Sequence, residues 1–229
     1  MNGHSGKVAF FWDKSYLWGL IAYDTFVNLG VDFELLTAEQ IRGGGLDGHD
    51  ILFVPGGWAG DKHRALGGEG QEEIRRFVRE GGSYLGFCGG AGLALSHDFG
   101  LSLAAIGRKP TGDRLPSFSG RIALTHKAPE HPIWKGVPDG MAFHAWWPGQ
   151  FFIPDGTDVE ILAAYGEPEA GSFVADLQIG PGVDWESWEE IYGTNLDPGR
   201  ITGEPAVIGA AFGRGRVLLS YLNFETPGD

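Results

Sequence analysis

One cysteine, Cys88, stands in the pattern that a nucleophile on a sharp strand-to-helix turn requires. The apolar run before it is typical of a buried strand, and Gly86 and Gly90 occupy the positions two before and two after it. A nucleophile on such a turn has a strained backbone, and larger side chains at those two positions would collide with it. The pattern favours a nucleophilic thiol; the alternative is a buried structural cysteine among glycines that serve only close packing.

The surroundings of Cys88 should support this chemistry. Residues 89–95 are expected to begin a helix whose N-terminal amides favour the thiolate. The amides of Gly89 and Gly57 are the two expected oxyanion donors, with Trp58 beside them in the pocket. We predict a positive φ at Cys88, a lowered thiol pKa, and faster reaction with iodoacetamide at pH 7 than a free thiol shows.

Strand and helix patterns alternate in the first half of the chain. Short apolar runs predict strands at residues 8–12, 31–36, 51–54 and 83–87. This alternation implies right-handed crossovers and a mostly parallel sheet, covered by helices on both faces. Ligands bind outside the carboxyl ends of strands in such sheets. We therefore expect Asp13, the turn at 55–58 and Cys88 to converge.

Two helices are expected between these strands. Residues 15–28 carry an apolar stripe at helical spacing, made of Leu17, Leu20, Ile21 and Val27. The clearest helix covers residues 71–80, where we predict an ion pair between Glu72 and Arg76, four residues apart.

The second half of the chain is less regular. Strands are predicted at 121–125, 159–165, 206–212 and 217–222. The glycine- and arginine-containing run 213–216 suggests a hairpin between the last two. Residues 143–153 are rich in aromatics and form either a wall of the active site or a packed loop. Residues 180–203 are expected to be a long surface excursion, and the acidic cluster 184–190 a solvated face.

The sequence around the cysteine resembles a known family. The matching segments are Val54-Pro55-Gly56-Gly57, residues 65–70, residues 74–78 and residues 81–90. They are similar to the biotin–protein ligase N-terminal domain family, of the class I glutamine amidotransferase-like superfamily. The resemblance is strong over residues 50–95 and looser elsewhere. It implies an α/β fold, a flavodoxin-like three-layer sandwich with a mostly parallel sheet, as a single domain over residues 1–229.

The chain departs from the pattern of an active amidotransferase. The resemblance implies a His-x-Glu near the C-terminus that serves the cysteine, but residues 223–225 read Asn-Phe-Glu. Glu225 keeps the carboxylate, whereas Asn223 cannot take a proton at neutral pH and would only orient or hydrogen-bond a ligand. Gly92 replaces the glutamine of active glutaminases, and Gly89 replaces the histidine that follows the cysteine in related peptidases. Glutamine hydrolysis is therefore not expected.

Another histidine would have to act as the base. His144 has the best surroundings, because it lies in the aromatic segment. The candidate catalytic residues are therefore Cys88, Glu225 and His144. His97 is expected to cap the end of the helix that follows the cysteine. Since Pro148 and Gly149 interrupt the aromatic segment, we predict that residues 143–152 line the pocket above Cys88.

Composition and charge limit the classes of partner, location and cofactor that the sequence allows. Of 229 residues, 17 are Lys or Arg and 30 are Asp or Glu, a net charge of −13 that disfavours nucleic-acid and membrane partners. The apolar runs are shorter than the ~20 residues of a membrane helix, no signal peptide is visible, and a single cysteine fits a reducing compartment. These features predict a cytoplasmic protein. No spacing suggests a metal or a phosphate-binding loop, so no metal or cofactor is expected.

Two functions remain open. The first is acyl transfer or amide hydrolysis on a small substrate, with Cys88 as the nucleophile. The second is a non-catalytic domain that binds a small molecule or a partner in the same pocket. Self-association into a homo-oligomer also stays open.

Overall fold

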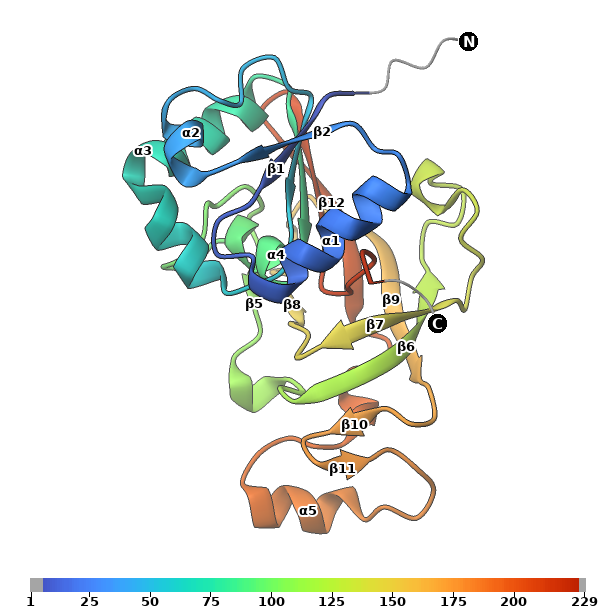
Figure 1. The fold of residues 1–229 in the computed structure, drawn as a ribbon. Coiled ribbons are helices and arrows are strands. Elements are labelled where there is room, and N and C mark those ends of the chain that lie inside the picture. Colours follow the sequence, from blue (N-terminus) through green and yellow to red (C-terminus); the bar gives the residue numbers. More distant parts are fainter. Residues whose placement is uncertain (1–5, 227–229) are drawn as a thin grey trace.

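A computed structural model describes residues 6–226, which form a large mixed sheet flanked by helices (Figure 1). The eleven strands of this sheet are β1 (Val8–Phe11), β2 (Phe33–Leu36), β3 (Ile51–Val54), β4 (Ser83–Phe87), β6 (Phe118–His126), β7 (Ala142–Trp146), β9 (Glu160–Pro168), β10 (Phe173–Val174), β11 (Leu177–Gln178), β12 (Pro205–Phe212) and β13 (Gly215–Ser220). The short strands β5 (Gly107–Arg108) and β8 (Phe151–Phe152) form a second sheet. The helices are α1 (Tyr16–Asn28), α2 (Ala38–Arg42), α3 (Ala59–Arg79), α4 (Gly89–Ala94) and α5 (Trp185–Tyr192), with 3₁₀ turns at Thr111–Asp113, Pro132–Trp134 and Pro198–Arg200.

The sheet has a parallel core and an antiparallel extension. Strands β2, β1, β3, β4 and β13 lie side by side in this order and are parallel. The order continues through β12, β9, β6, β10 and β11, and all these pairings are antiparallel. The predicted parallel sheet is therefore confirmed for the core, and the predicted hairpin is confirmed as β12–β13. The less regular second half of the sequence forms the extension.

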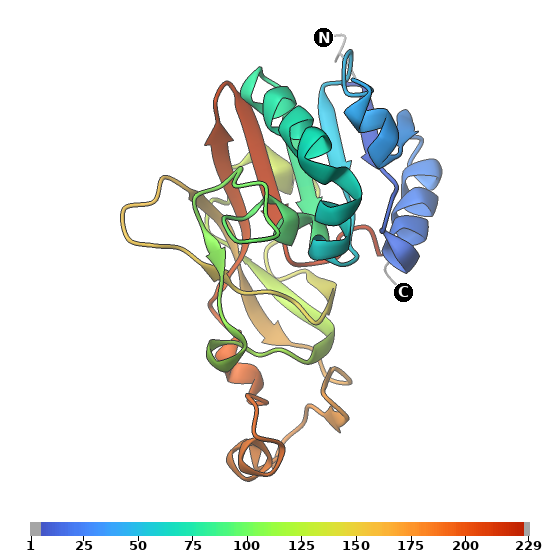
Figure 2. The same cartoon turned by 90° about the vertical axis from the view of Figure 1, so that its left-hand side faces the viewer.

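Helices cover both faces of the parallel core, which makes three layers. Alternate residues of a strand point to opposite faces. In β1, Ala9 and Phe11 pack in a large apolar cluster with α2, α3 and α4, whereas Phe10 packs in a smaller one with Ala22 of α1. In Figure 2, α3 runs across the face of the sheet that is turned to the viewer. This layering leaves the carboxyl ends of the core strands free to form a site.

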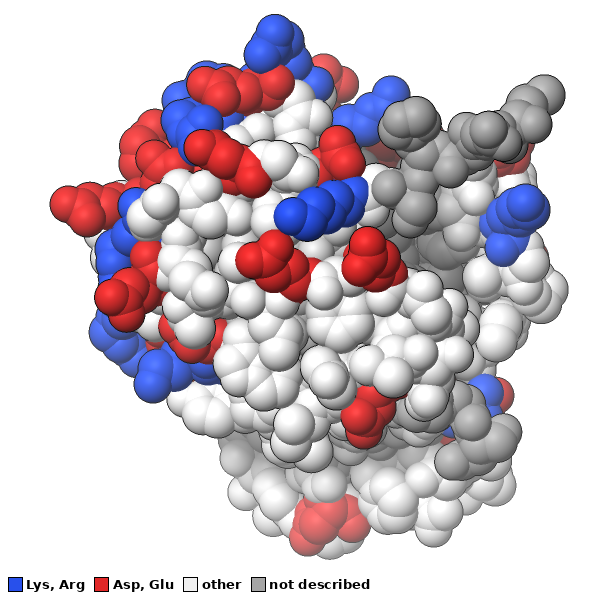
Figure 3. All heavy atoms as spheres, turned by 45° about the horizontal axis from the view of Figure 1, so that its top comes forward, with Lys and Arg blue, Asp and Glu red and all other residues white. Residues whose placement is uncertain are grey.

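Helix α1 turns the expected apolar stripe away from the sheet. Gly19 and Ala22 are its buried residues, while Leu17, Leu20 and Val27 are exposed. Spacing identifies residues that share a helix face, but not the face that packs. Here the smaller residues allow close approach to β1. Figure 3 shows few charged residues over the middle of the face it presents, whereas they gather along its left edge, over α2 and α3.

Helix α3 is longer than the predicted 71–80 segment. It begins at Ala59 and bends at Gly67, whose φ of 61° departs from helical values. The predicted ion pair between Glu72 and Arg76 is absent. Arg76 pairs instead with Asp47, Glu73 and Glu80, and Glu72 pairs with Arg75 and Arg79. Carboxylates three residues away compete for the same guanidinium.

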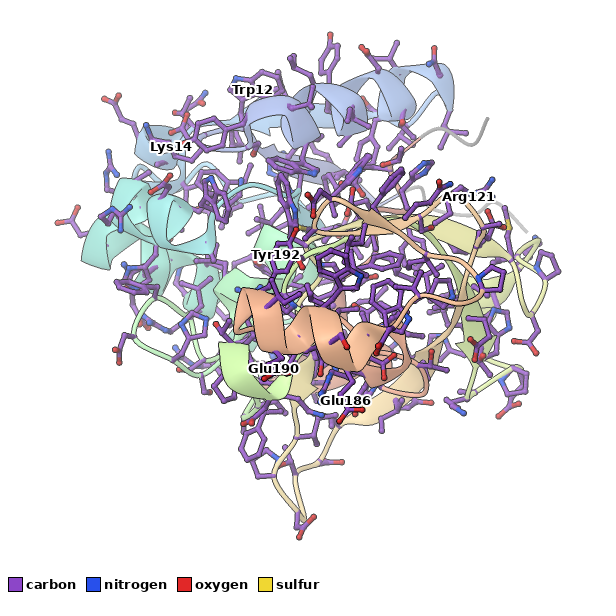
Figure 4. The ribbon with its side chains drawn as sticks, turned by 90° about the horizontal axis from the view of Figure 1, so that it is seen from below. Trp12, Lys14, Arg121, Glu186, Glu190 and Tyr192 are labelled. Carbon is purple, nitrogen blue, oxygen red and sulfur yellow. The ribbon has the colours of Figure 1, made fainter. Side chains whose placement is uncertain are left out.

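The region after β9 extends away from the core. It carries β10, β11 and α5 at the lower end of the molecule (Figure 1). Glu186 and Glu190 are exposed on α5, the helix nearest the viewer in Figure 4. Glu189 instead binds Arg200 at 2.7 Å and accepts from the amides of residues 196 and 197. The solvated face predicted for the acidic cluster is thus confirmed for Glu186 and Glu190, while Glu189 joins α5 to the next turn. Within residues 6–226, no helix has the length and apolarity needed to cross a membrane.

Candidate functional site

Cys88 lies at the sharp turn between β4 and α4. Its backbone has φ 50° and ψ −109°, which confirms the predicted positive φ. Such a conformation costs a non-glycine residue about 1–3 kcal/mol. Contacts on both sides hold it: the Cys88 amide donates to the Ser220 carbonyl of β13 at 2.8 Å, and the Gly92 amide donates to the Cys88 carbonyl at 3.0 Å. The turn is therefore anchored to the sheet and to the helix.

Two glycines allow α4 to begin directly against the turn after β3. A Cβ atom on Gly89 would overlap the Gly57 carbonyl, and one on Gly90 would overlap the Val54 carbonyl. Neither overlap can be relieved by turning a side chain, because the obstacles are backbone atoms. This contact brings the turn at Gly57 beside Cys88, as the sequence predicted.

A pocket of about 230 Å³ opens above Cys88. Its lining includes the predicted residues Gly57, Trp58 and Gly89. The other lining residues are Trp18, Ala59, Gly60, Gly92, His97, Phe99, Arg108, Trp146, Trp147, Gly149 and Tyr221. Most of the larger side chains are aromatic, so the pocket has apolar walls. The Gly57 amide donates to no acceptor within residues 6–226, which leaves it free for a ligand.

The aromatic segment forms one wall of this pocket, as predicted, but only in part. Trp146, Trp147 and Gly149 contribute to the lining, and Trp147 has a positive φ of 51°. His144 is not among the described lining residues. It lies two positions earlier on β7, and its ring stacks on Trp146 at a centroid distance of 5.4 Å. The lining therefore includes only the last residue of β7, Trp146, and not the His144 that the sequence proposed as the base.

The imidazole that does line the pocket belongs to His97, and both of its nitrogens are engaged. Its Nε2 donates to the Gly92 carbonyl at 2.9 Å, and its Nδ1 accepts from the Phe99 amide at 3.1 Å. The predicted capping of α4 is thus confirmed. In this tautomer His97 offers no free lone pair, so it cannot serve as a base without losing a backbone contact.

Asn223 and Glu225 form a buried pair beyond the pocket lining. The Asn223 side-chain amide donates to Glu225 Oε1 at 3.1 Å, and the two residues are 1% and 2% exposed. Asn223 Oδ1 and Glu225 Oε2 have no partner within residues 6–226. Burial raises the pKa of Glu225 from 4.5 to about 7. The pair therefore stands at the positions where the resemblance implied an imidazole and a carboxylate. It contains no imidazole, and the Glu225 carboxyl is about half ionised at pH 7.

The pKa of the Cys88 thiol is raised, contrary to the sequence prediction. Burial is the main cause and the Glu225 carboxyl adds to it, so the pKa rises to about 11. A hydrogen bond from the Gly89 amide and the charges of Arg108 and Lys62 act in the opposite direction. The effect of burial on the thiol pKa outweighs that of the amides of α4, a helix of only six residues.

Lys62 is a buried cation that sequence reasoning missed. It is 0% exposed, its Nζ donates to Ser15 Oγ at 2.6 Å and to the Asp13 carbonyl at 3.3 Å, and burial lowers its pKa to about 7. Asp13 thus joins the site through its carbonyl, while its carboxylate caps α2 by accepting from Ala38. The local sequence does not indicate that a lysine in the first turn of a helix is buried, because its burial depends on the loop that packs over it.

Arg108 and Tyr221 were also missed. Arg108 belongs to the short strand β5, and Tyr221 follows β13, so they reach the pocket from distant parts of the chain. The Arg108 guanidinium lies over the Tyr221 ring, 5.9 Å from its centroid. Among the described residues, no group of three His, Cys, Asp or Glu could hold a metal ion.

Comparisons with known proteins support the resemblance around the cysteine. The model of the family described as "Biotin-protein ligase, N terminal" matches residues 47–99. A segment of 47 residues is 45% identical to an uncharacterized protein of Chlamydia muridarum (strain MoPn / Nigg). That match covers 20% of this chain and only 18% of the other protein. The family model covers β3, α3, β4 and the elbow, and leaves the antiparallel extension uncovered.

Solved structures share the fold across nearly the whole chain. A ThuA-like protein from Bacteroides uniformis has a TM-score of 0.59 and 14% identity, over 96% of this chain and 82% of that one. A glutamine amidotransferase from Thermotoga maritima has a TM-score of 0.55 and 12% identity, over 97% of this chain and 77% of that one. The chain therefore has a glutamine amidotransferase-like fold. At these identities the likeness concerns the fold alone.

Proposed function

We propose that this protein uses Cys88 as a nucleophile on the acyl group of a small substrate. The observation that carries the proposal is the strained conformation of Cys88, with φ 50°, at the floor of a pocket. Packing alone gives no reason to keep such a conformation. The unpaired amide of Gly57 and the amide of Gly89 are proposed to hold the developing oxyanion.

The proposed reaction has two steps. The thiol releases its proton to water, Sγ bonds to the acyl carbon, and the alcohol or amine leaves with a proton taken from solvent. Water or an acceptor amine then attacks the thioester, and the thiol re-forms. With a pKa of about 11, roughly one molecule in ten thousand carries the thiolate at pH 7, so the reaction should be slow there and faster in alkaline solution.

The test is acylation by p-nitrophenyl acetate, followed by mass spectrometry of the intact protein and of its peptides. Wild type should gain one acetyl group on Cys88 and release nitrophenol faster than an equal concentration of free cysteine at the same thiolate fraction. Cys88→Ala should lose this acetyl group and retain only slow lysine acetylation. Labelling of Cys88 no faster than that of free cysteine at the same thiolate fraction would contradict the proposal.

A second candidate function is binding without catalysis. It is favoured by the absence of a free imidazole in the described site, since both nitrogens of His97 are engaged and Asn223 stands in the position where the resemblance implies a histidine. Under this alternative, ligands bind equally well to wild type and to Cys88→Ala, and no thioester forms. The acylation experiment therefore separates the two functions.

A further inference from the structure

Two polar side chains near the Cys88 pocket have buried atoms without hydrogen-bond partners, and an exposed arginine lies against one of them. Tyr221 lines the pocket and is 3% exposed, and its hydroxyl has no hydrogen bond within residues 6–226. Arg114 is half-buried, and its Nε and Nη1 are inaccessible to solvent and without partners in the same range. Arg108 lines the pocket and is exposed, so its guanidinium is accessible to a ligand.

These groups are close enough to act on one another. Arg108 lies over the Tyr221 ring, and the charges of both Arg108 and Arg114 oppose the rise that burial causes in the pKa of the Tyr221 hydroxyl. Burial and the charge of Arg108 together lower the pKa of Arg114 to about 10. Arg108 on the pocket lining and Arg114 beside Tyr221 are therefore two guanidinium groups that form no ion pair with a described residue.

Unpaired buried donors are expensive. Each costs about 1–3 kcal/mol, and more when it is charged, so folded proteins provide acceptors for nearly all of them. An acceptor that suits two guanidinium groups and a hydroxyl at once is an oxyanion. Because the chain has a net charge of −13, a singly charged anion is favoured over a doubly charged one. The tryptophans that also line the pocket favour a ligand with an apolar body.

We propose that Arg108, Arg114 and Tyr221 form a subsite for a carboxylate, and that the pocket takes a small carboxylate-bearing molecule with an apolar body. This deepens the proposed function, on which it rests for the role of Cys88, because it adds an anionic group to the substrate. The carboxylate lies on the side of Arg108 and Tyr221, the apolar body lies against Trp146 and Trp147, and the acyl carbon faces the sulfur.

The experiment measures binding of phenylacetate, its neutral isostere phenylacetamide, and phenylphosphonate by calorimetry and by quenching of the pocket tryptophans. Phenylacetate should bind about 10- to 100-fold more tightly than phenylacetamide, the range expected of charge-assisted hydrogen bonds. Arg108→Met and Arg114→Met should each remove most of this preference. Tyr221→Phe, which keeps the ring, should reduce it about threefold.

The matched control is Arg216→Met, since Arg216 is exposed at the far end of β13 and its side chain has no partner among the described residues. It makes the same change of charge and should leave the preference intact. Equal binding of the acid and the amide, binding of neither, or an unchanged preference in both arginine variants would overturn the subsite. Tighter binding of phenylphosphonate than of phenylacetate would overturn the choice of a carboxylate.

These outcomes are independent of the acylation test. If the carboxylate preference is present in Cys88→Ala and wild type forms no thioester, the subsite stands and the proposed function fails. If a thioester forms but the acid and the amide bind equally, the proposed function stands and the subsite fails. Melting temperatures of all variants, compared with that of wild type, identify any loss that is due to unfolding.

Discussion

The elbow after β4 and the segment after β13 meet at the same pocket, but they differ in how much of a catalytic arrangement they retain. The elbow has the strained cysteine, the glycines and the free amide that a nucleophile needs. Residues 221–225 supply a tyrosine, an asparagine and a carboxyl whose pKa is raised to about 7. Nucleophile geometry is built into the backbone, whereas proton transfer depends on one side chain. A substitution can therefore remove the group that transfers the proton while the backbone geometry that positions the nucleophile persists.

The largest expected effect tests how firmly the elbow is fixed. Gly89→Ala places a methyl group on the Gly57 carbonyl and should destabilise the fold by at least about 3 kcal/mol in urea unfolding. The control is Gly92→Ala in the same helix, where the new Cβ would lie 3.4 Å from Ala59 Cβ. It should be neutral or stabilising by up to about 1 kcal/mol. Equal stabilities of the two variants would show that the elbow has room to relax.

The next effect concerns the carboxyl of the second segment. The pKa of Glu225 is about 7 in the folded protein and about 4.5 when unfolded, so the folded state holds the proton longer as pH rises. Stability should therefore fall by up to about 3 kcal/mol between pH 4.5 and 7. Glu225→Gln should remove most of this fall, and Glu190→Gln, an exposed change on α5, should not. A wild-type stability that is flat over this range would contradict the raised pKa.

The rate of Cys88 alkylation shows which of two opposing effects on the thiol pKa is larger, the rise caused by burial or the fall caused by the helix amides. A thiol with a pKa of about 11 should react with iodoacetamide at pH 7 about 20-fold more slowly than free cysteine, because its smaller thiolate fraction outweighs its greater nucleophilicity. The rate should rise about tenfold per pH unit up to pH 10. The unfolded protein in denaturant is the control. Reaction faster than free cysteine at pH 7 would favour the helix amides over burial.

The smallest expected effect tests whether the second segment alone limits the chemistry. Asn223→His restores the imidazole that the resemblance implies beside Glu225 and should raise the rate of p-nitrophenyl acetate turnover about tenfold at pH 7, below the roughly 10²- to 10⁴-fold of a well-positioned base because nothing else in the site is adjusted to it. Asn223→Ala removes the amide without adding a base and should not raise it. An unchanged rate in a folded Asn223→His protein would show that residue 223 cannot reach the thiol.

Much of the fold could be predicted because its signals are local. The four short apolar runs of the first half became the strands β1 to β4, and the apolar runs of the second half became β6, β9, β12 and β13. The antiparallel extension beyond β12 could not be predicted, because its register depends on contacts between segments more than thirty residues apart. The site divides in the same way: the sequence located Cys88, Gly57 and Gly89, whereas Arg108 and Tyr221 come from elements without any motif.

The sequence by itself determined the elbow, since steric exclusion by neighbouring backbone atoms acts at fixed spacing and leaves glycine as the only residue that fits at 89 and 90. Only the tertiary structure decided the chemistry of that elbow. The pKa of Cys88 depends on how far the assembled fold buries the thiol and on the Glu225 carboxyl brought near it. The burial of Lys62 and the choice of the packed face of α1 depend likewise on which surfaces meet. Burial is a property of the assembled fold, and no local spacing encodes it.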